Sequence, residues 1–257
     1  METVKVLIPV YRSALSETER ASVAQTVRML GRHPLLLLHP CNVDVSAVLA
    51  EFPALRPLAV SDEWLGTRNG IAGYNRMMLS ADFYDLFADT EYILVCHTDA
   101  WIFRDELSEW CARGYDCVAA PWVRRPVYDL PLVRQWMALR LRQSLRSGRP
   151  TRQILYGRVG NGGLSLRRVA AFRTACDRYH ERIERFAADP HHLFNEDVFW
   201  ATVPAEFRYP SWREALAFAV DTHPAYCLRL AGGRLPFGCH SWSKPRMRRF
   251  WKRIIRW

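Results

Sequence analysis

The sequence predicts an α/β fold with a mostly parallel sheet flanked by helices. Three observations support this prediction. Apolar runs rich in Val, Ile and Leu alternate with helix-like segments over about the first 120 residues, an alternation typical of parallel sheets. The runs are apolar at successive positions, as in strands that are buried on both faces. The chain has 257 residues, of which 49% are hydrophobic, so it can form one large domain; we expect this domain at residues 1–243, followed by a basic tail at 244–257.

The elements are expected in a regular order along the first half of the chain. The first strand is predicted at residues 4–10, which read Val-Lys-Val-Leu-Ile-Pro-Val. A helix should run from Ser16 to Gly31, because a Ser-x-x-Glu capping box opens it and a glycine favours its end. Further strands are predicted at 35–38, 58–60, 92–96 and 117–120, with helices at 43–52, 69–79 and 106–113 between them. Such an order implies right-handed crossovers between parallel strands.

The pattern changes after Pro121. The stretch from Leu130 to Leu145 mixes apolar residues with arginines, and a further arginine, Arg146, follows it directly. This spacing predicts an amphipathic helix with a basic face. Two interpretations stay open: a helix packed on the core with a solvated charged face, or a helix that contacts an anionic acceptor or a membrane surface.

The net charge of +10 is concentrated at the C-terminus. Residues 244–257 contain seven cations and no acid, interleaved with Met, Phe, Trp and Ile. As a helix, this tail would place its apolar residues on one side, which is the pattern of an interfacial membrane helix. We expect it to bind an anionic membrane surface, with docking of its apolar side on the domain as the alternative; nucleic-acid binding is a weaker alternative, because basic clusters serve any polyanion.

Composition excludes several other classes of protein. No apolar run reaches the length of about 18 residues that a transmembrane helix needs. The N-terminus lacks the basic region and cleavage site of a secretory signal, so we expect a cytoplasmic protein, held peripherally on the inner face of the membrane. Seven cysteines without Cys-x-x-Cys spacing indicate neither a disulfide framework nor a zinc cluster.

The first candidate for chemistry is Asp99, in the sequence His97-Thr98-Asp99 that follows the strand at 92–96. A carboxylate at the carboxyl end of a buried strand lies where open α/β sheets bind ligands. The alternative is an ordinary turn, since Asp often hydrogen-bonds its own backbone there.

Three later segments add to this candidate site. Residues 157–166 concentrate four glycines in seven positions, which indicates close approach of the backbone to a ligand or positive φ angles. Asn195-Glu196-Asp197 places two acids among aromatic residues, where the alternative is a helix start with Asn195 as the N-cap. His240 ends a short apolar stretch and, taken alone, is more often a structural histidine than a ligand.

Together and in this order, these segments resemble the GT-A class of nucleotide-sugar glycosyltransferases. More narrowly, they are similar to a glycosyltransferase-like domain family of unknown function. The resemblance covers residues 4–243 and rests on the segments 74–80, 98–100, 120–122, 160–167, 195–199 and 236–240. It implies a GT-A fold, which is a Rossmann-type, mostly parallel sheet flanked by helices.

The resemblance assigns a metal site to the residues after the fourth strand. His97, Thr98 and Asp99 occupy the Asp-x-Asp position, whose acids hold a divalent cation on the diphosphate of the donor. His240 matches the late histidine that completes the metal shell. Because His97 replaces the first acid, Mn²⁺ is favoured over Mg²⁺, since Mn²⁺ accepts imidazole more readily.

The resemblance also assigns donor, acceptor and catalytic residues. Gly162 and Gly163 match the glycine-rich loop near the donor sugar. Asp197 resembles the general base that deprotonates the acceptor hydroxyl in inverting members, with Glu196 positioning the acceptor.

The nucleotide is expected at the end of the first strand. Pro9, Val10 and Tyr11 would contact the base, on which Tyr11 can stack. Arg68 and Arg76 are candidates for the diphosphate, because a guanidinium group matches phosphate geometry.

The function expected from this resemblance is glycosyl transfer. The donor would be a nucleotide sugar, with UDP as the expected nucleotide, and the acceptor a hydroxyl of a glycan or of a lipid-linked sugar. The alternative is a non-catalytic module that binds a nucleotide sugar or a glycan, because the Asp-x-Asp motif is incomplete.

Overall fold

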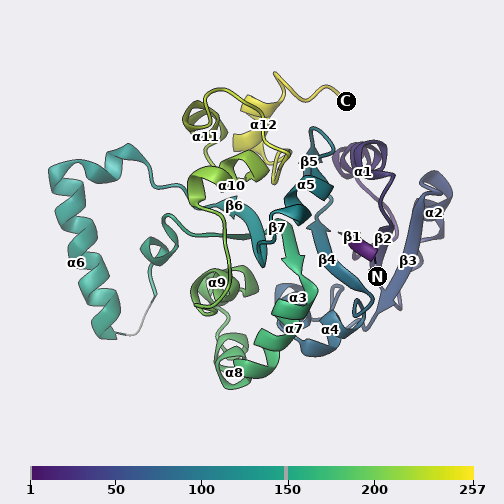
Figure 1. Ribbon diagram of the computed structural model, residues 1–257, viewed down its shortest axis with the longest axis horizontal. Coiled ribbons are helices and arrows are strands. Elements are labelled where there is room, and N and C mark those ends of the chain that lie inside the picture. The colour runs from purple at the N-terminus through teal and green to yellow at the C-terminus, as the bar shows by residue number, and fades with distance from the viewer. Residues whose placement is uncertain (1, 148–149) are drawn as a thin grey trace.

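The computed structural model describes residues 2–147 and 150–257, and its centre is a six-stranded sheet with helices on both faces (Figure 1). The strand order is β3-β2-β1-β4-β7-β6. Neighbouring strands pair in parallel from β3 to β4, whereas β7 pairs antiparallel with both β4 and β6. The predicted mostly parallel α/β sheet is therefore confirmed. The strands are β1 (Glu2–Pro9), β2 (Leu35–Pro40), β3 (Leu55–Val60), β4 (Thr90–Cys96), β6 (Cys117–Pro121) and β7 (Val159–Arg168).

Helices connect these strands as the sequence predicts. The capping box that opens α1 (Glu17–Leu30) is formed, with the backbone amide of Ser16 donating to Glu19 at 2.8 Å. The other helices of the first half are α2 (Ser46–Glu51), α3 (Gly70–Met78), α4 (Ala81–Asp85), α5 (Leu107–Ala112) and α6 (Pro131–Ser147), with the 3-10 helix η1 at Pro126–Asp129. The second half contains η2 (Arg152–Leu155), α7 (Val169–Arg178), α8 (His180–Ala188), η3 (His192–Phe194), α9 (Glu196–Thr202), α10 (Trp212–Phe218), α11 (Pro224–Leu230) and α12 (Pro245–Trp251).

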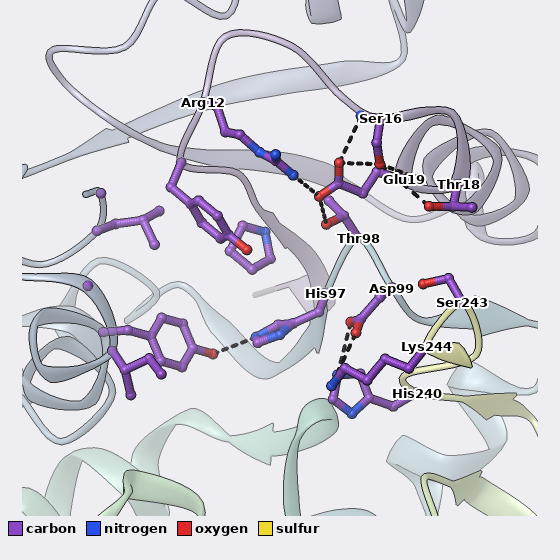
Figure 2. A pocket seen from close by; sticks show the side chains of 17 residues that line it. Arg12, Ser16, Thr18, Glu19, His97, Thr98, Asp99, His240, Ser243 and Lys244 are labelled. Carbon is purple, nitrogen blue, oxygen red and sulfur yellow. Dashed lines mark hydrogen bonds and ion pairs between the residues drawn. The ribbon is translucent and has the colours of Figure 1, made fainter. Parts of the chain in front are cut away.

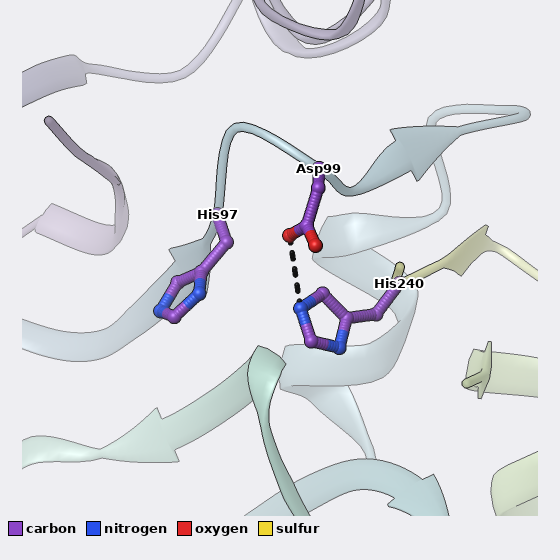
Figure 3. A group of neighbouring side chains, drawn as sticks. All are labelled: His97, Asp99 and His240. Carbon is purple, nitrogen blue, oxygen red and sulfur yellow. Dashed lines mark ion pairs between the residues drawn. The ribbon is translucent and has the colours of Figure 1, made fainter. Parts of the chain in front are cut away.

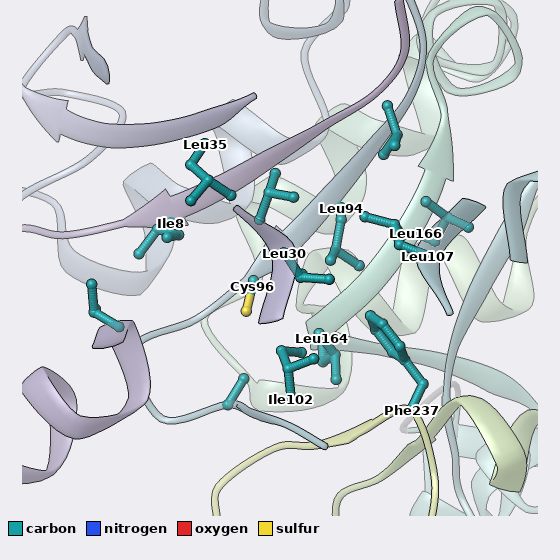
Figure 4. Close-up of a cluster of buried hydrophobic side chains, with 14 of the residues drawn as sticks. Ile8, Leu30, Leu35, Leu94, Cys96, Ile102, Leu107, Leu164, Leu166 and Phe237 are labelled. Atoms are coloured by element: carbon teal, nitrogen blue, oxygen red, sulfur yellow. The ribbon is translucent and has the colours of Figure 1, made fainter. Parts of the chain in front are cut away.

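The central strands are apolar throughout because both of their faces are covered. Along β1, Val6 and Ile8 belong to the core cluster on one face of the sheet, and Leu7 belongs to the cluster on the other. Leu94 of β4 packs in the first cluster with Leu166 of β7 (Figure 4). Alternate residues of a strand point to opposite faces, so two buried faces remove the polar alternation.

Strand β7 brings the glycine-rich segment to the ligand-binding edge of the sheet. It runs antiparallel to β4, and Cys96 at the end of β4 pairs with Leu164. The start of β7 therefore lies beside the residues that follow β4. The backbone amide of His97 donates to the carbonyl oxygen of Gly163 at 2.9 Å.

A second, three-stranded sheet was not predicted. It consists of β5 (Trp101–Ile102), β9 (Gly238–Cys239) and β8 (Ala219–Val220), with β9 in the middle. Cys239 pairs with Trp101 on one side and with Val220 on the other. Strands of two residues carry no periodicity, which is why the sequence did not predict them.

The C-terminal tail is packed against the domain. This packing corrects the expectation that its apolar side is free to bind a membrane. Helix α12 is shorter than predicted, and Trp251 and Ile255 are buried in a cluster with Trp242. Phe250 and Ile254 pack against the same cluster. The alternative interpretation, an apolar side docked on the domain, describes this tail, and its cations rather than its apolar residues face outward.

Helix α6, unlike the tail, exposes several large apolar side chains. Figure 1 shows it at one edge of the molecule, away from the central sheet. Its exposed residues include Leu132, Trp136 and Leu139. Among the described residues, no helix is both long and apolar enough to cross a membrane.

The docked tail predicts a large loss of stability for Trp251→Ala. Trp251 has no exposed surface, and truncation of a buried tryptophan costs about 3–5 kcal/mol of unfolding free energy. Urea denaturation of the purified protein measures this change. Trp257→Ala is the matched control, because that side chain is 46% exposed. Equal stability of the two variants would contradict the docking.

Candidate active site

The candidate active site lies where β4, β8 and β9 end. Asp99 follows β4 and precedes β5, Asp221 directly follows β8, and His240 directly follows β9. Pairing within the small sheet brings these three positions together, and the backbone amide of His240 donates to the carbonyl oxygen of Val220 at 3.0 Å. The small sheet therefore brings together side chains that are distant in the sequence; Asp99 and His240 are 141 residues apart.

His240 is held between two carboxylates. Its Nε2 lies 2.9 Å from Oδ1 of Asp99, and its Nδ1 lies 3.0 Å from Oδ1 of Asp221 (Figure 3 shows the first pair). Asp221 is fixed in turn by Asn161, whose Nδ2 donates to Oδ2 at 3.1 Å. The imidazole of His240 is thus oriented from both of its nitrogens.

The charges of this cluster stabilise one another. Burial lowers the pKa of His240, but hydrogen bonds to Asp221 and Asp99 outweigh it and raise the pKa to about 9. Burial raises the pKa of Asp99, but the hydrogen bond and charge of His240 outweigh this and hold the pKa well below its usual range. Without a cation, His240 is therefore an imidazolium and Asp99 a carboxylate.

His97 supplies a neutral imidazole. Its Nε2 lies 2.9 Å from the hydroxyl of Tyr74 on α3, which leaves Nδ1 free of that partner. Burial and the neighbouring charge of His240 lower the pKa of His97 to about 3. Ligand atoms of His97, Asp99 and His240 all lie within 4.8 Å of one another, so these three side chains form a group that can hold a metal ion.

Gly163 makes room for His240. A Cβ atom at this position would lie 2.1 Å from Nε2 of His240, so any other residue would displace the imidazole ring. A Cβ atom at Gly162 would lie 2.5 Å from Oε1 of Glu196. The glycines were expected to approach a ligand; in the structure the space above them is filled by the side chains of the site itself.

The cluster opens into a cavity of 680 Å³ (Figure 2). Pro9, Tyr11 and Thr98, which lie at or just after the ends of β1 and β4, line it. Two cations also line it, namely Arg12, which pairs with Glu19 at 2.6 Å, and Lys244, whose Nζ lies 3.8 Å from Oδ2 of Asp99. The cavity thus combines the metal-ligand group with nearby positive charge.

Three of the predicted donor-binding residues lie elsewhere. Val10 is buried in the core and does not line this cavity. Arg68 points to solvent and pairs with Glu63 at 3.5 Å. Arg76 lines a different cavity, between α3 and α8, with His180. Helix α3 directs Arg76 away from the 680 Å³ cavity and presents Tyr74 to it, whereas Arg68 lies before the helix. A role of these three residues in donor binding stays a prediction.

Glu196 is buried and ion-paired, and its role in positioning the acceptor stays a prediction. It pairs with the buried Arg167 of β7, whose Nη2 donates to Oε1 at 3.0 Å. Asn195 is the N-cap residue of α9, as the alternative interpretation expected, but its side chain makes no capping hydrogen bond. Oδ1 of Asn75 on α3 instead accepts a hydrogen bond from the backbone amide of Glu196 at 3.1 Å. The start of α9 is therefore fixed by two other elements.

Asp197 lies beside Glu196 without a cationic partner among the described residues. Burial, reinforced by the charge of Glu196, raises its pKa to about 7. The Cβ positions of Gly162 and Gly163 point to opposite faces of β7, toward the two acids of α9 and toward His240 respectively. Asp197 is not among the residues that line the 680 Å³ cavity, but it lies close enough to Asp221, the carboxylate on His240, for that charge to contribute to its raised pKa.

Four residues of this site were missed by sequence reasoning. Tyr74, Arg167 and Asp221 give no local signal, because each acts through a partner that is distant in the chain. Lys244 was counted with the tail, although it lies four residues after His240.

The family of the chain is given by a direct match. The model of the family described as "Protein of unknown function (DUF5672)" matches residues 58–240, which is more than half of the chain. This segment contains every residue of the metal-ligand group. No curated protein matches the sequence.

Solved structures of similar architecture are glycosyltransferases. The galactosyltransferase LgtC, in complex with donor and acceptor sugar analogues, superposes with a TM-score of 0.54 at 12% identity, covering 92% of this chain and 86% of its own. Mouse xyloside xylosyltransferase 1 gives 0.53 at 13% identity, covering 93% and 97%. Core-mannan synthase A of Aspergillus fumigatus, in its Mn/GDP form, gives 0.50 at 11% identity, covering 73% and 65%. The chain therefore belongs to the DUF5672 family and has the GT-A fold of nucleotide-sugar glycosyltransferases.

Proposed function

We propose that the protein is a metal-dependent glycosyltransferase that uses a nucleoside diphosphate sugar. The observation that carries this proposal is the group of His97, Asp99 and His240 at the edge of the cavity. A divalent cation there would neutralise the diphosphate and stabilise it as the leaving group. Transfer breaks the bond between the anomeric carbon and the diphosphate oxygen and forms a bond from that carbon to the acceptor oxygen.

The donor set suits Mn²⁺. His97 and His240 supply imidazole nitrogens and Asp99 supplies a carboxylate, a mixture that favours Mn²⁺ over the oxygen-preferring Mg²⁺. Asp221 hydrogen-bonds the second nitrogen of His240, as outer carboxylates do for metal-bound histidines. A cation would take the place of the proton that His240 shares with Asp99.

The other cavity residues would bind the nucleotide and its phosphates. Lys244 and Arg12 are cations that line the cavity, so they replace Arg68 and Arg76 as the candidates for the diphosphate. Tyr11 is 47% exposed at the end of β1 and can stack on the base, for which uracil is our expectation.

Asp197 is the proposed acceptor of the hydroxyl proton. A pKa of about 7 suits proton transfer near neutral pH. This role requires the acceptor, a glycan or a lipid-linked sugar, to approach along the face of β7 that carries α9. Inversion at the anomeric carbon is the stereochemistry expected with such a base, and NMR of the product tests it.

A metal-dependent thermal shift tests the donor site. UDP-sugar and Mn²⁺ together should raise the Tm by about 5 °C or more at about 100 times the Kd, because ligands that bind only the native state stabilise it. Asp99→Asn should abolish the Mn²⁺-dependent part of the shift. Asp85→Asn, which alters only an exposed ion pair with Arg173, is the matched control.

The result separates the proposal from its alternative. Turnover of the nucleotide sugar with Mn²⁺ supports a transferase, and a shift without turnover on a panel of glycan acceptors supports a binding module. No shift with any nucleotide or metal would overturn both.

The pH dependence of transfer tests Asp197. The base must be ionised, so kcat should rise with pH through about 7 and level off above it. Asp197→Asn should lower kcat by about 10² or more and remove this limb of the profile. Because the folded state disfavours ionised Asp197, the free energy of unfolding falls as pH rises from the usual carboxyl pKa to about 7 and is then constant. The variant lacks this loss and should therefore keep or gain Tm at pH 8. A variant with full kcat and an unchanged profile would refute the assignment.

A further inference from the structure

Helix α6 leaves one of its sides without a protein partner. The element it packs against most is the short helix η1, which directly precedes it. Its inner side carries Met137 and Ser144, both buried, and Gln153 donates to the carbonyl oxygen of Met137 at 3.0 Å. The helix is therefore anchored on one side, and Figure 1 shows its position at the edge of the molecule.

The outer side of α6 is an exposed apolar stripe. Leu132, Trp136 and Leu139 are 79%, 53% and 55% exposed, and their spacing of four and three residues aligns them along one side of the helix. Trp136 lies at the edge of this side, because it also lines a hollow with Met137 and Gln153. Leu130, just before the helix, adds a further exposed leucine, at 55% exposure. Monomeric proteins rarely leave such a contiguous apolar surface uncovered.

Arginines border this stripe on both sides. At about 100° per residue, Arg140 lies on one flank and Arg142 and Arg146 lie on the other. The guanidinium of Arg140 sits 4.9 Å from the ring centroid of Trp136. The helix has four arginines and no acidic residue, and among the described residues no carboxylate lies within ion-pair distance of them.

We propose that α6 docks the protein on the surface of a membrane that contains anionic lipids. A helix with Trp and Leu on one side and flanking cations lies in the interface plane, with its apolar side in the acyl boundary and its cations at the head groups. The expected membrane contact therefore moves from the tail, whose apolar residues are buried, to α6. This proposal does not depend on the chemistry of the cavity.

Two other occupants fit the same surface less well. In a symmetric dimer the stripe would face its own copy and bring the arginines of both helices together without an acid to pair with them. A nucleic acid would pair with the arginines but would leave the Leu and Trp side chains in water. An anionic bilayer satisfies both parts of the surface at once.

Vesicle co-sedimentation of the full chain tests the proposal. The protein should bind vesicles of phosphatidylcholine and phosphatidylglycerol with an affinity at least about tenfold higher than that for pure phosphatidylcholine vesicles. The affinity for the anionic vesicles should fall as the salt concentration rises. The combined substitution Leu132→Ser, Trp136→Ser and Leu139→Ser should weaken binding about tenfold or more. The control variant combines Leu86→Ser, at the C-cap of α4, with Leu230→Ser, at the end of α11, and thus removes two exposed leucines away from α6. Circular dichroism checks that each variant is folded.

A charge-reversal pair distinguishes α6 from the tail. Arg140→Glu, Arg142→Glu and Arg146→Glu should abolish binding, whereas Arg246→Glu, Arg249→Glu and Arg253→Glu change the net charge equally and should weaken it less. Equal losses in the two sets would overturn the assignment to α6. Two other results would overturn this assignment: wild-type protein that does not bind anionic vesicles, or a wild-type dimer in solution that the triple serine substitution converts to a monomer.

Discussion

The fit of the His240 imidazole against Gly163, between Asp99 and Asp221, is the constraint on which the site depends. A Cβ atom on residue 163 would lie 2.1 Å from Nε2 of His240, so the ring can occupy this place only above a glycine. The two carboxylates then fix the ring from both nitrogens. Burial alone would lower the pKa of His240, but hydrogen bonds to the two acids raise it. A divalent cation in this position would meet ligands that are already oriented.

The fold supplies this constraint from three separate parts of the chain. Antiparallel β7 places Gly163 beside the end of β4, and the backbone amide of His97 bonds to the Gly163 carbonyl. The small sheet aligns the ends of β8 and β9 with the start of β5. On the face of β7 opposite His240, Glu196 and Arg167 form a buried ion pair. Breaking that pair would leave one buried charge without its partner, which is strongly destabilising.

The sequence predicted what is local and periodic. The parallel strands, the capping box at Ser16 and the acid after β4 were found because each has a signal within a few residues. His240 was found through its resemblance to a family motif, not through its own neighbours. Asp221 and Tyr74 were missed because their roles exist only in contacts across the fold. Arg68 and Arg76 do not line the cavity, because residue type indicates affinity for phosphate but not the direction in which the fold presents the side chain.

The same limit applies to the charged surfaces. The tail and α6 both contain several cations and no acid, interleaved with apolar residues that include Met and Trp in each segment. Only the packing distinguishes them, because Trp251 is buried against the domain whereas Trp136 is exposed. Amphipathic spacing thus identifies a helix with two different sides, and the tertiary structure decides which side meets protein.

The most direct test of the central claim is the Mn²⁺ affinity of Asp221→Asn, measured by isothermal titration calorimetry beside wild-type protein and Asp85→Asn. Asp221 touches no proposed metal position and acts only through His240 and Asn161. Because such outer carboxylates orient a metal-bound histidine, the account predicts Mn²⁺ binding weakened about 10–100-fold in Asp221→Asn and unchanged in Asp85→Asn. Wild-type affinity in Asp221→Asn would contradict the claim that the fixed imidazole of His240 builds the site.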